Sequence, residues 1–324
     1  MTDTCSEAPR MLDYDETRAV CGWKQLRGFY EDLPRGECKS WIFRGQKTFS
    51  KAFPTDGKKK CFETSLERAA SDLDDPDRKN LPDIEMRLLR HFQRKAHHYT
   101  LHIPDAENTL EWLALMRHHD APTRLLDWTY SFYVAAFNAV QHTCGEGYEV
   151  WALNTAYFAA ENREHVEGLD RLLTEHAGHQ RALGRLHRGE AAGLSEDVAR
   201  PPNGQVRQHV DEAVVQHLWL HPTKLVHPVN AFTLNERLTI QRGVFLFPGD
   251  ISVPFIENLN AAIYQHDLSN NLRRLSIRGG LERSDLKTRL EILEELYEIN
   301  ISTTTLFPGL DGFARSLQTH LPPS

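Results

Sequence analysis

Residues 118–129 read His118-His119-Asp120-Ala121-Pro122-Thr123-Arg124-Leu125-Leu126-Asp127-Trp128-Thr129. This stretch joins two histidines, an arginine, an aspartate and an indole around a proline, and apolar helical patterns lead into it and out of it. Connecting loops are usually rich in Ser, Gly, Asn and Lys, whereas these side chains bind anions, transfer protons or stack on rings. The composition therefore predicts a functional site held between two core helices.

The flanking patterns predict the scaffold of this segment. Apolar residues recur at helical spacing from about residue 109 to residue 118. Pro122 disfavours helix at the residue before it, and Ser131 can cap a second helix that runs through Val140. We therefore expect a helix, a loop and a second helix in this order.

The rest of the chain alternates irregularly between strand and helix patterns, with no visible repeat. Strand patterns cover residues 40–46, 148–153, 243–247 and 275–278, and helix patterns cover residues 15–32, 84–99, 161–187 and 284–298. The alternation predicts an α+β fold with a mixed or largely antiparallel central sheet flanked by helices. We expect a helical lead-in over residues 1–39 and one domain over residues 40–324. Gly, Pro and charged residues near 187–212 predict a polar insertion that is exposed or mobile.

Composition narrows the class of protein. The 324 residues are 40% hydrophobic and 26% charged, with a formal net charge of −7, which is typical of a soluble globular chain and argues against a generally basic nucleic-acid binder. The five cysteines form no C-x-x-C pair, and there is no apolar run of 18 residues. We therefore expect a cytoplasmic protein with reduced thiols and no membrane contact.

A second cluster, Phe43-Arg44-Gly45-Gln46, ends a predicted strand. Gly45 would allow close backbone approach by a ligand, and the Arg44 guanidinium could hold a phosphate or carboxylate through two parallel hydrogen bonds. The alternative is a buried Arg–Asp pair that ties the sheet to the central loop.

The polar residues of the central segment also have two interpretations. Arg124 and Asp127 could bind a ligand, or they could pair with each other or with Arg44 as a structural clamp. His118 and His119 point about 100° apart on a helix, so at most one faces the same pocket as Arg124. That histidine could be a general base or hold a ribose hydroxyl, or it could simply complement a helix C-terminus. The apolar residues of the segment are expected to be scaffold.

A third cluster runs from Asn235 to Phe245. Glu236 lies near a helix start capped by Asn235, where a carboxylate also complements the helix dipole. Gln241 precedes the turn into a strand and would present its side chain at a sheet edge. His217 and His221 have a spacing that can hold zinc, but no third ligand is evident, so no metal is expected.

These three clusters, in this order, resemble the FRG domain family, a bacterial and phage-associated group with a Phe/Tyr-Arg-Gly motif. The family's central signature is similar to residues 117–129 here, except that Arg117 replaces a common glutamine and Asp120 a common glycine. Its later elements match Arg237 to Phe245 and Phe307 to Gly312, so the resemblance covers about residues 40–320.

The arrangement is similar to the plan of ADP-ribosyltransferases, which implies an enzyme that uses NAD as substrate, in the role of a defence or toxin effector. On this likeness Arg44, Gln46, Arg124 and Asp127 would bind the dinucleotide, and His119, Glu236 and Gln241 would be catalytic. The Glu-x-Glu or Gln-x-Glu motif is missing, because Gln241-Arg242-Gly243 stands in its place. The alternative function is a non-catalytic module that binds a phosphorylated ligand or nucleic acid. A third interpretation makes Arg44, Arg124 and Asp127 a buried structural network.

Overall fold

The computed structural model describes residues 20–34, 41–47, 62–72, 78–142, 147–155, 203–231, 236–264, 271–279 and 282–317. The chain divides into two units. Unit 1 comprises residues 1–59, 129–154 and 260–324, and unit 2 comprises residues 60–128 and 155–259.

The described strands form a six-stranded sheet in the order β4-β5-β2-β1-β3-β6. Their bounds are β1 Trp41–Lys47, β2 Leu126–Thr129, β3 Gly147–Asn154, β4 Val226–Val229, β5 Gly243–Pro248 and β6 Leu272–Arg278. The pairs β1–β2, β1–β3, β3–β6 and β4–β5 are antiparallel. The predicted α+β fold with a largely antiparallel sheet is therefore confirmed.

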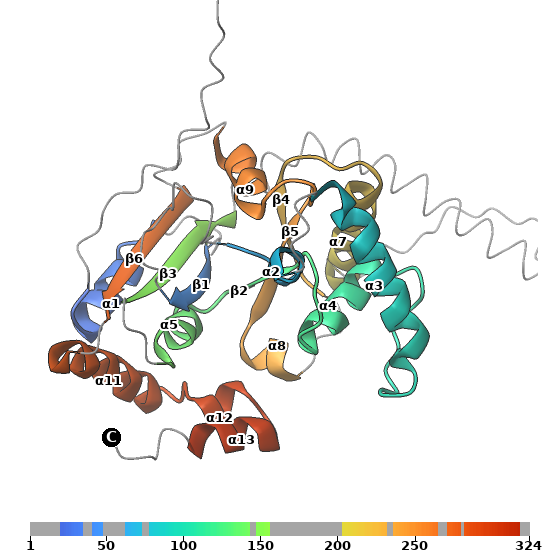
Figure 1. The fold of residues 1–324 in the computed structure, drawn as a ribbon. Helices are drawn as coiled ribbons and strands as arrows, with labels where there is room; N and C mark the ends of the chain where they lie inside the picture. The colour runs from blue at the N-terminus through green and yellow to red at the C-terminus, as the bar shows by residue number, and fades with distance from the viewer. Residues whose placement is uncertain are drawn as a thin grey trace, which may run out of the picture. The chain divides into compact units, whose positions relative to one another are not determined.

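Unit 1 places β1, β3 and β6 against helices. Its helices are α1 (Trp23–Glu31), α5 (Phe132–Val140), α11 (Arg283–Glu298), α12 (Thr303–Leu306) and α13 (Leu310–Ser316). Alternate residues of the strands point to one face, because side chains along a strand alternate in direction. On that face Phe43, Val150 and Leu275 join the alanines of α5 in one apolar core. Ser131 accepts a hydrogen bond from the Val134 amide at 3.4 Å, so the predicted N-cap of α5 (Figure 1) is confirmed.

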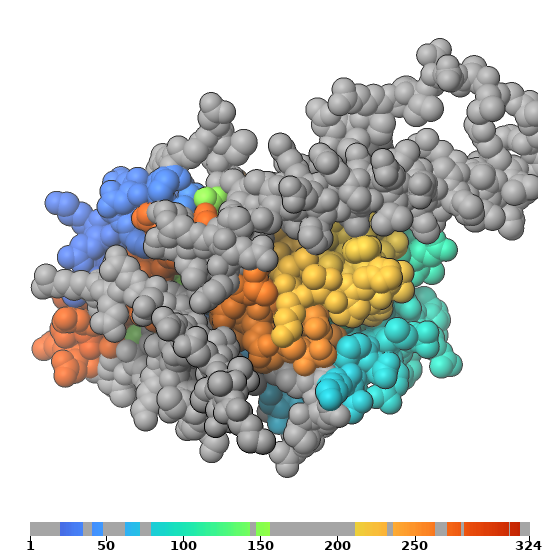
Figure 2. Space-filling view, turned by 90° about the horizontal axis from the view of Figure 1, so that it is seen from above, coloured from blue at the N-terminus to red at the C-terminus, as the bar shows by residue number. Residues whose placement is uncertain are grey.

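Unit 2 is built mainly from helices. They are α2 (Ser65–Asp72), the 3-10 helix η1 (Arg78–Asn80), α3 (Leu81–Ala96), α4 (Thr109–His118), α7 (Asn203–Leu220) and α8 (Glu236–Ile240), while α9 (Phe255–Tyr264) contains the boundary with unit 1. Leu113, Leu125 and Phe247 bury their side chains in its core. In the space-filling view the yellow atoms of residues 211–231 lie beside orange atoms of residues 236–264 (Figure 2), and within these two segments β4 pairs with β5.

Glu212 of α7 fastens the start of α4. Its two carboxylate oxygens accept the amides of Thr109 and Leu110 at 2.8 and 2.9 Å. These amides belong to the first turn of α4, where backbone N–H groups have no partner within the helix. Burial raises the pKa of Glu212 above its ordinary value, against the effect of these hydrogen bonds. The central segment therefore leaves a helix whose beginning is held by a side chain distant in sequence.

Several sequence predictions need correction or lie outside the described residues. Residues 203–212 of the predicted insertion belong to α7, whereas residues 187–202, the helix predicted over 161–187 and the cap Asn235 lie outside. The first helix is shorter than expected, and Val20 instead bridges Ile277 of β6. Residues 20–33 of the predicted lead-in contribute to the core of unit 1. Among the helices that the structure describes, none combines the length and apolar composition needed to cross a bilayer.

Candidate functional site

The Phe-Arg-Gly-Gln segment lies in β1, and Phe43 and Gly45 face α5. The ring of Phe43 packs edge-on against Phe132, with centroids 5.4 Å apart. A Cβ at Gly45 would come within 1.8 Å of the carbonyl oxygen of Ala135. The close approach that Gly45 allows is therefore that of the α5 backbone, not that of a ligand as the sequence suggested.

Arg44 and Gln46 alternate with these residues and belong to the opposite face of β1. Gln46 donates from Nε2 to Oε2 of Glu149 at 3.2 Å. Glu149, only 3% exposed, also accepts the indole N–H of Trp151 at 3.1 Å and lies 3.6 Å from Nη1 of Arg274. Arg44 is the cross-strand partner of Trp151. Both predicted β1 residues therefore lie on a polar face to which β3 and β6 also contribute.

The turn after α4 depends on Asp120. This residue has φ of 57°, in the left-handed region that favours glycine. Aspartate tolerates this conformation better than most residues because its short side chain can hydrogen-bond locally. Asp120, at a position where glycine is common in the FRG motif, thus adopts a backbone conformation typical of glycine.

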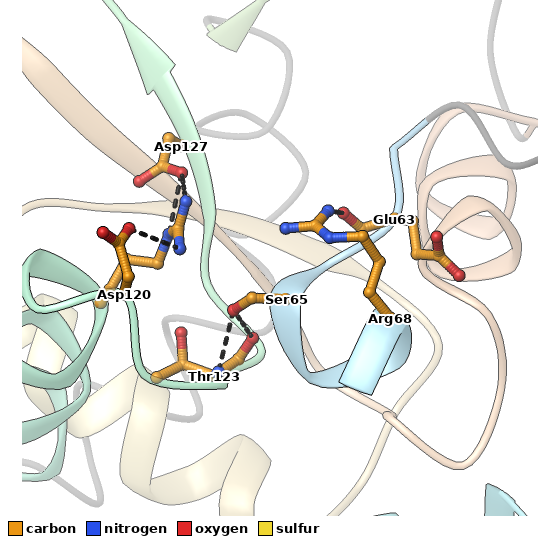
Figure 3. Close-up of polar contacts among 7 residues, drawn as sticks. Glu63, Ser65, Arg68, Asp120, Thr123 and Asp127 are labelled. Atoms are coloured by element: carbon orange, nitrogen blue, oxygen red, sulfur yellow. Dashed lines mark hydrogen bonds and ion pairs between the residues drawn. The ribbon is translucent and has the colours of Figure 1, made fainter. Parts of the chain in front are cut away.

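Arg117 and Asp127 form the ion pair that closes this turn. Nε and Nη2 of Arg117 donate to Oδ2 of Asp127 at 2.9 and 2.6 Å (Figure 3). Burial by itself would lower the pKa of Arg117, but the Asp127 carboxylate raises it above the ordinary value. The suggested pairing of Asp127 with Arg124 is wrong, since Arg124 binds a different carboxylate.

Arg124 is buried, and its guanidinium pairs with Glu85 of α3. Nε donates to Oε2 of Glu85 at 2.6 Å, and the backbone N–H of Arg124 donates to Oε1 at 2.9 Å. Arg124 is 4% exposed and Glu85 0%. The rings of Trp219 and Phe247 lie 4.3 and 4.9 Å from the guanidinium carbon, within cation–π range. This geometry fits the interpretation of Arg124 as part of a buried structural network. The role of Arg124 as a ligand contact stays a prediction.

The remaining residues of the segment serve as scaffold, as expected. Thr123 donates its backbone N–H to Oγ of Ser65 at 3.0 Å and accepts from the same hydroxyl at 3.2 Å (Figure 3). Trp128 stacks on Phe62, with centroids 5.8 Å apart and an interplanar angle of 17°. Both leucines of the segment are buried.

The two histidines at the end of α4 differ in their surroundings. His118 is half-buried, and its ring centroid lies 4.8 Å from that of the exposed His119. Burial lowers the pKa of His118 below its ordinary value, His119 and Arg237 lower it further, and Asp120 raises it. Burial and the charge of Arg237, the second residue of α8, therefore disfavour the protonated form of His118.

Glu236 and Gln241 lie at the two ends of α8. Glu236 is the first residue of the helix and is exposed. The backbone N–H of Gln241 donates to the carbonyl oxygen of Arg237 at 2.9 Å, and Arg242 then takes φ of 50° before β5 begins. These contacts place both residues beside Arg237, and their catalytic roles stay predictions.

The predicted site residues divide between the two units. Arg44 and Gln46 belong to unit 1, and the others belong to unit 2: His119, Arg124, Asp127, Glu236 and Gln241. Sequence reasoning missed two buried carboxylates, although the sequence contains a signal for each. Glu85 falls between Leu81 and Leu89 on the buried stripe of α3, and Glu149 interrupts an apolar strand.

Metal coordination finds no support in the described parts of the chain. No group of three or more His, Cys, Asp or Glu side chains there could hold an ion. The rings of His217 and His221 lie 5.0 Å apart, as their spacing on α7 requires.

Comparison with known proteins identifies one domain. Residues 39–146 match the model of the FRG domain, which includes the Phe-Arg-Gly-Gln segment and the whole central motif. The later elements that resemble the family, at 237–245 and 307–312, lie outside the matched residues. No curated protein and no solved structure matches the chain.

Proposed function

We propose that the protein is an enzyme of the ADP-ribosyl-transfer type that uses a nicotinamide dinucleotide. The observation that carries the proposal is that His118 is half-buried and that the Arg237 guanidinium of α8 contributes to lowering its pKa. A neutral imidazole can accept a proton at pH 7, and a guanidinium binds phosphate through two parallel hydrogen bonds. The FRG domain match over residues 39–146 supports the choice of this reaction class only through the resemblance described above.

The reaction needs a base and an anion-binding group. The bond between the ribose C1′ and the nicotinamide nitrogen breaks, and nicotinamide leaves as a neutral molecule. An acceptor O–H or N–H bonds to C1′ and gives its proton to His118, while Arg237 holds the diphosphate. The exposed carboxylate of Glu236 would stabilise the developing positive charge on the sugar. The side chain of Gln241 would orient the sugar. We choose His118 as the base in place of His119 because His118 is half-buried, whereas His119 is exposed.

The direct test measures nicotinamide release and label transfer. The full-length protein is incubated with adenine-labelled NAD and a cell lysate. We expect His118→Gln to lower turnover at least ~100-fold, the usual contribution of a general base. His217→Gln, which removes a histidine from α7, is the matched control and should leave turnover unchanged. If His119→Gln abolishes turnover instead, the sequence-based assignment of the base is right.

The pH profile gives a second readout. Because the pKa of His118 is lowered, the wild-type rate should stay level at and below the ordinary histidine pKa of ~6.5 and fall only as pH drops through the lowered value. His118→Gln should abolish this fall of the rate at low pH, the acid limb of the profile. Absence of both nicotinamide release and label transfer from the folded protein would contradict the proposal, and dinucleotide binding without turnover would assign the chain to the non-catalytic alternative.

A further inference from the structure

We propose that the face of β1, β3 and β6 opposite α5 binds a phosphate-bearing small molecule, with Arg44 and Arg274 as ligand contacts and Glu149 as a positioning residue. This site lies within unit 1 and includes Arg44, to which the transferase likeness assigns dinucleotide binding, whereas His118 and Arg237 of the transferase proposal belong to unit 2. Neither Arg274 nor Glu149 belongs to the motifs that the sequence singled out.

The strand register brings the two arginines to the same row of the sheet. Arg44 pairs with Trp151, and Trp151 pairs with Arg274. In the next row on the same face, Gln46 pairs with Glu149. Arg44 and Arg274 are two strand spacings apart, about 10 Å between Cα atoms. Two arginine side chains can close that distance on one phosphate or diphosphate group.

The charged side chains of this face contrast with the other face of the same strands. The opposite face of the same strands is filled by apolar residues that pack against α5, among them Phe43 and Val150. Burying a carboxylate and a guanidinium costs free energy that an apolar pair would avoid. Glu149 is 3% exposed, and the Arg274 side chain is 12% exposed. Local departures from the packing rules of this kind concentrate at functional sites.

The contacts of Glu149 explain how it would act. Its Oε2 accepts from Gln46 and from the indole of Trp151, and its Oε1 faces Arg274 at 3.6 Å. The guanidinium of Arg274 also lies 5.7 Å from the ring of Trp151. One carboxylate therefore contacts side chains from three other positions of the face. A guanidinium carries five N–H donors, so Arg274 can bind a phosphate while it keeps its protein partners.

Calorimetric titration of the full-length protein tests the site, with inorganic pyrophosphate, ADP and adenosine as probes. Pyrophosphate and ADP should bind and adenosine should not, because the recognised chemistry is the phosphate. Raising the salt concentration should weaken binding. The experiment is repeated with Arg237→Gln, which removes the guanidinium of α8 in unit 2. Binding that persists in this variant belongs to a different site from the transferase centre, so the two proposals can fail separately.

Variants then separate the ligand contacts from the positioning residue. Arg274→Gln and Arg44→Gln should each weaken pyrophosphate binding at least tenfold, and Arg274→Lys should weaken it less than Arg274→Gln. Arg278→Gln removes the same charge from an exposed position of β6 and should change nothing. Glu149→Gln is decisive, because removing a negative charge near an anion site should strengthen binding by electrostatics alone, whereas loss of positioning should weaken it.

Thermal melts of every variant confirm that the protein remains folded before binding is compared. Arg274→Lys keeps the charge and serves as the conservative form if Arg274→Gln does not fold. The proposal is overturned if folded wild-type protein binds neither pyrophosphate nor ADP, or if the variants at 44 and 274 bind as wild type does. Tighter binding by Glu149→Gln would remove the positioning role.

Discussion

Two arginines beside buried carboxylates, Arg124 in unit 2 and Arg274 in unit 1, differ in their distance from the carboxylate. Arg124 donates to Glu85 at 2.6 Å, and two aromatic ring centroids lie 4.3 and 4.9 Å from its guanidinium carbon. Arg274 approaches Glu149 only to 3.6 Å and lies over one ring at 5.7 Å. A guanidinium enclosed by short hydrogen bonds and rings has the geometry of a structural anchor. We assign Arg274, which lies on a sheet face at 3.6 Å from its carboxylate, to ligand contact, and stability measurements can separate the two roles.

The largest expected effect comes from breaking the Arg124–Glu85 pair. Arg124→Gln leaves the Glu85 carboxylate buried without its cation, and loss of one partner of a buried pair costs about 3–5 kcal/mol of unfolding free energy. Arg274→Gln should cost less than half as much. Urea unfolding followed by circular dichroism measures both.

A double variant, Arg124→Met with Glu85→Leu, is the control for this comparison. Replacing both charges by apolar side chains removes the unpaired carboxylate, so it should recover much of the loss. Equal losses for Arg124→Gln and Arg274→Gln would mean that the unit 1 face is a structural network too, which would contradict the contrast between the arginines.

The local elements of this fold were predictable because their signals are local. The apolar spacing and the cap at Ser131 place α4 and α5 correctly, and the alternation of β1 and β3 places two neighbouring strands. The FRG motif was also recognisable, since its residues are contiguous. In each case the residues that decide the structure lie within a few positions of one another.

The partners of the charged residues were not predictable, because they come from distant positions. Arg124 meets Glu85, 39 residues earlier, and Gln46 meets Glu149, 103 residues later. Neither motif contains the carboxylate that its polar side chain binds, so the motifs alone offered Asp127, the nearest acid in the sequence, as one possible partner of Arg124. A charged residue within an apolar sequence pattern, such as Glu85 or Glu149, is the signal that could have corrected this.

A smaller effect is expected at the Arg117–Asp127 pair, which resembles the Arg124 pair in geometry but not in burial. The Asp127 side chain is 44% exposed, so solvent screens the charges. Arg117→Gln, which restores the residue common in the FRG motif, should cost about 1 kcal/mol or less. Thermal melts at low and high salt measure it, and the wild-type advantage should shrink in salt. A loss comparable with that of Arg124→Gln would show that exposure does not distinguish the two pairs.

The smallest effect on stability is expected at Asp120, where the backbone matters more than the side chain. Glycine relieves the backbone strain of φ 57° in the folded protein, but it also gives the unfolded chain more conformational freedom. Because these two effects offset each other, Asp120→Gly should change the unfolding free energy by no more than about 0.5 kcal/mol. Asp120→Ala keeps the strain without the local hydrogen-bonding side chain and should be the less stable of the two in urea unfolding.

The two variants at Asp120 should nevertheless share one effect, which concerns His118. Asp120 raises the pKa of His118, so its removal should lower that pKa further and move the acid limb of turnover to lower pH in both. An unchanged limb in both would show either that Asp120 does not act on His118 or that His118 is not the group that titrates.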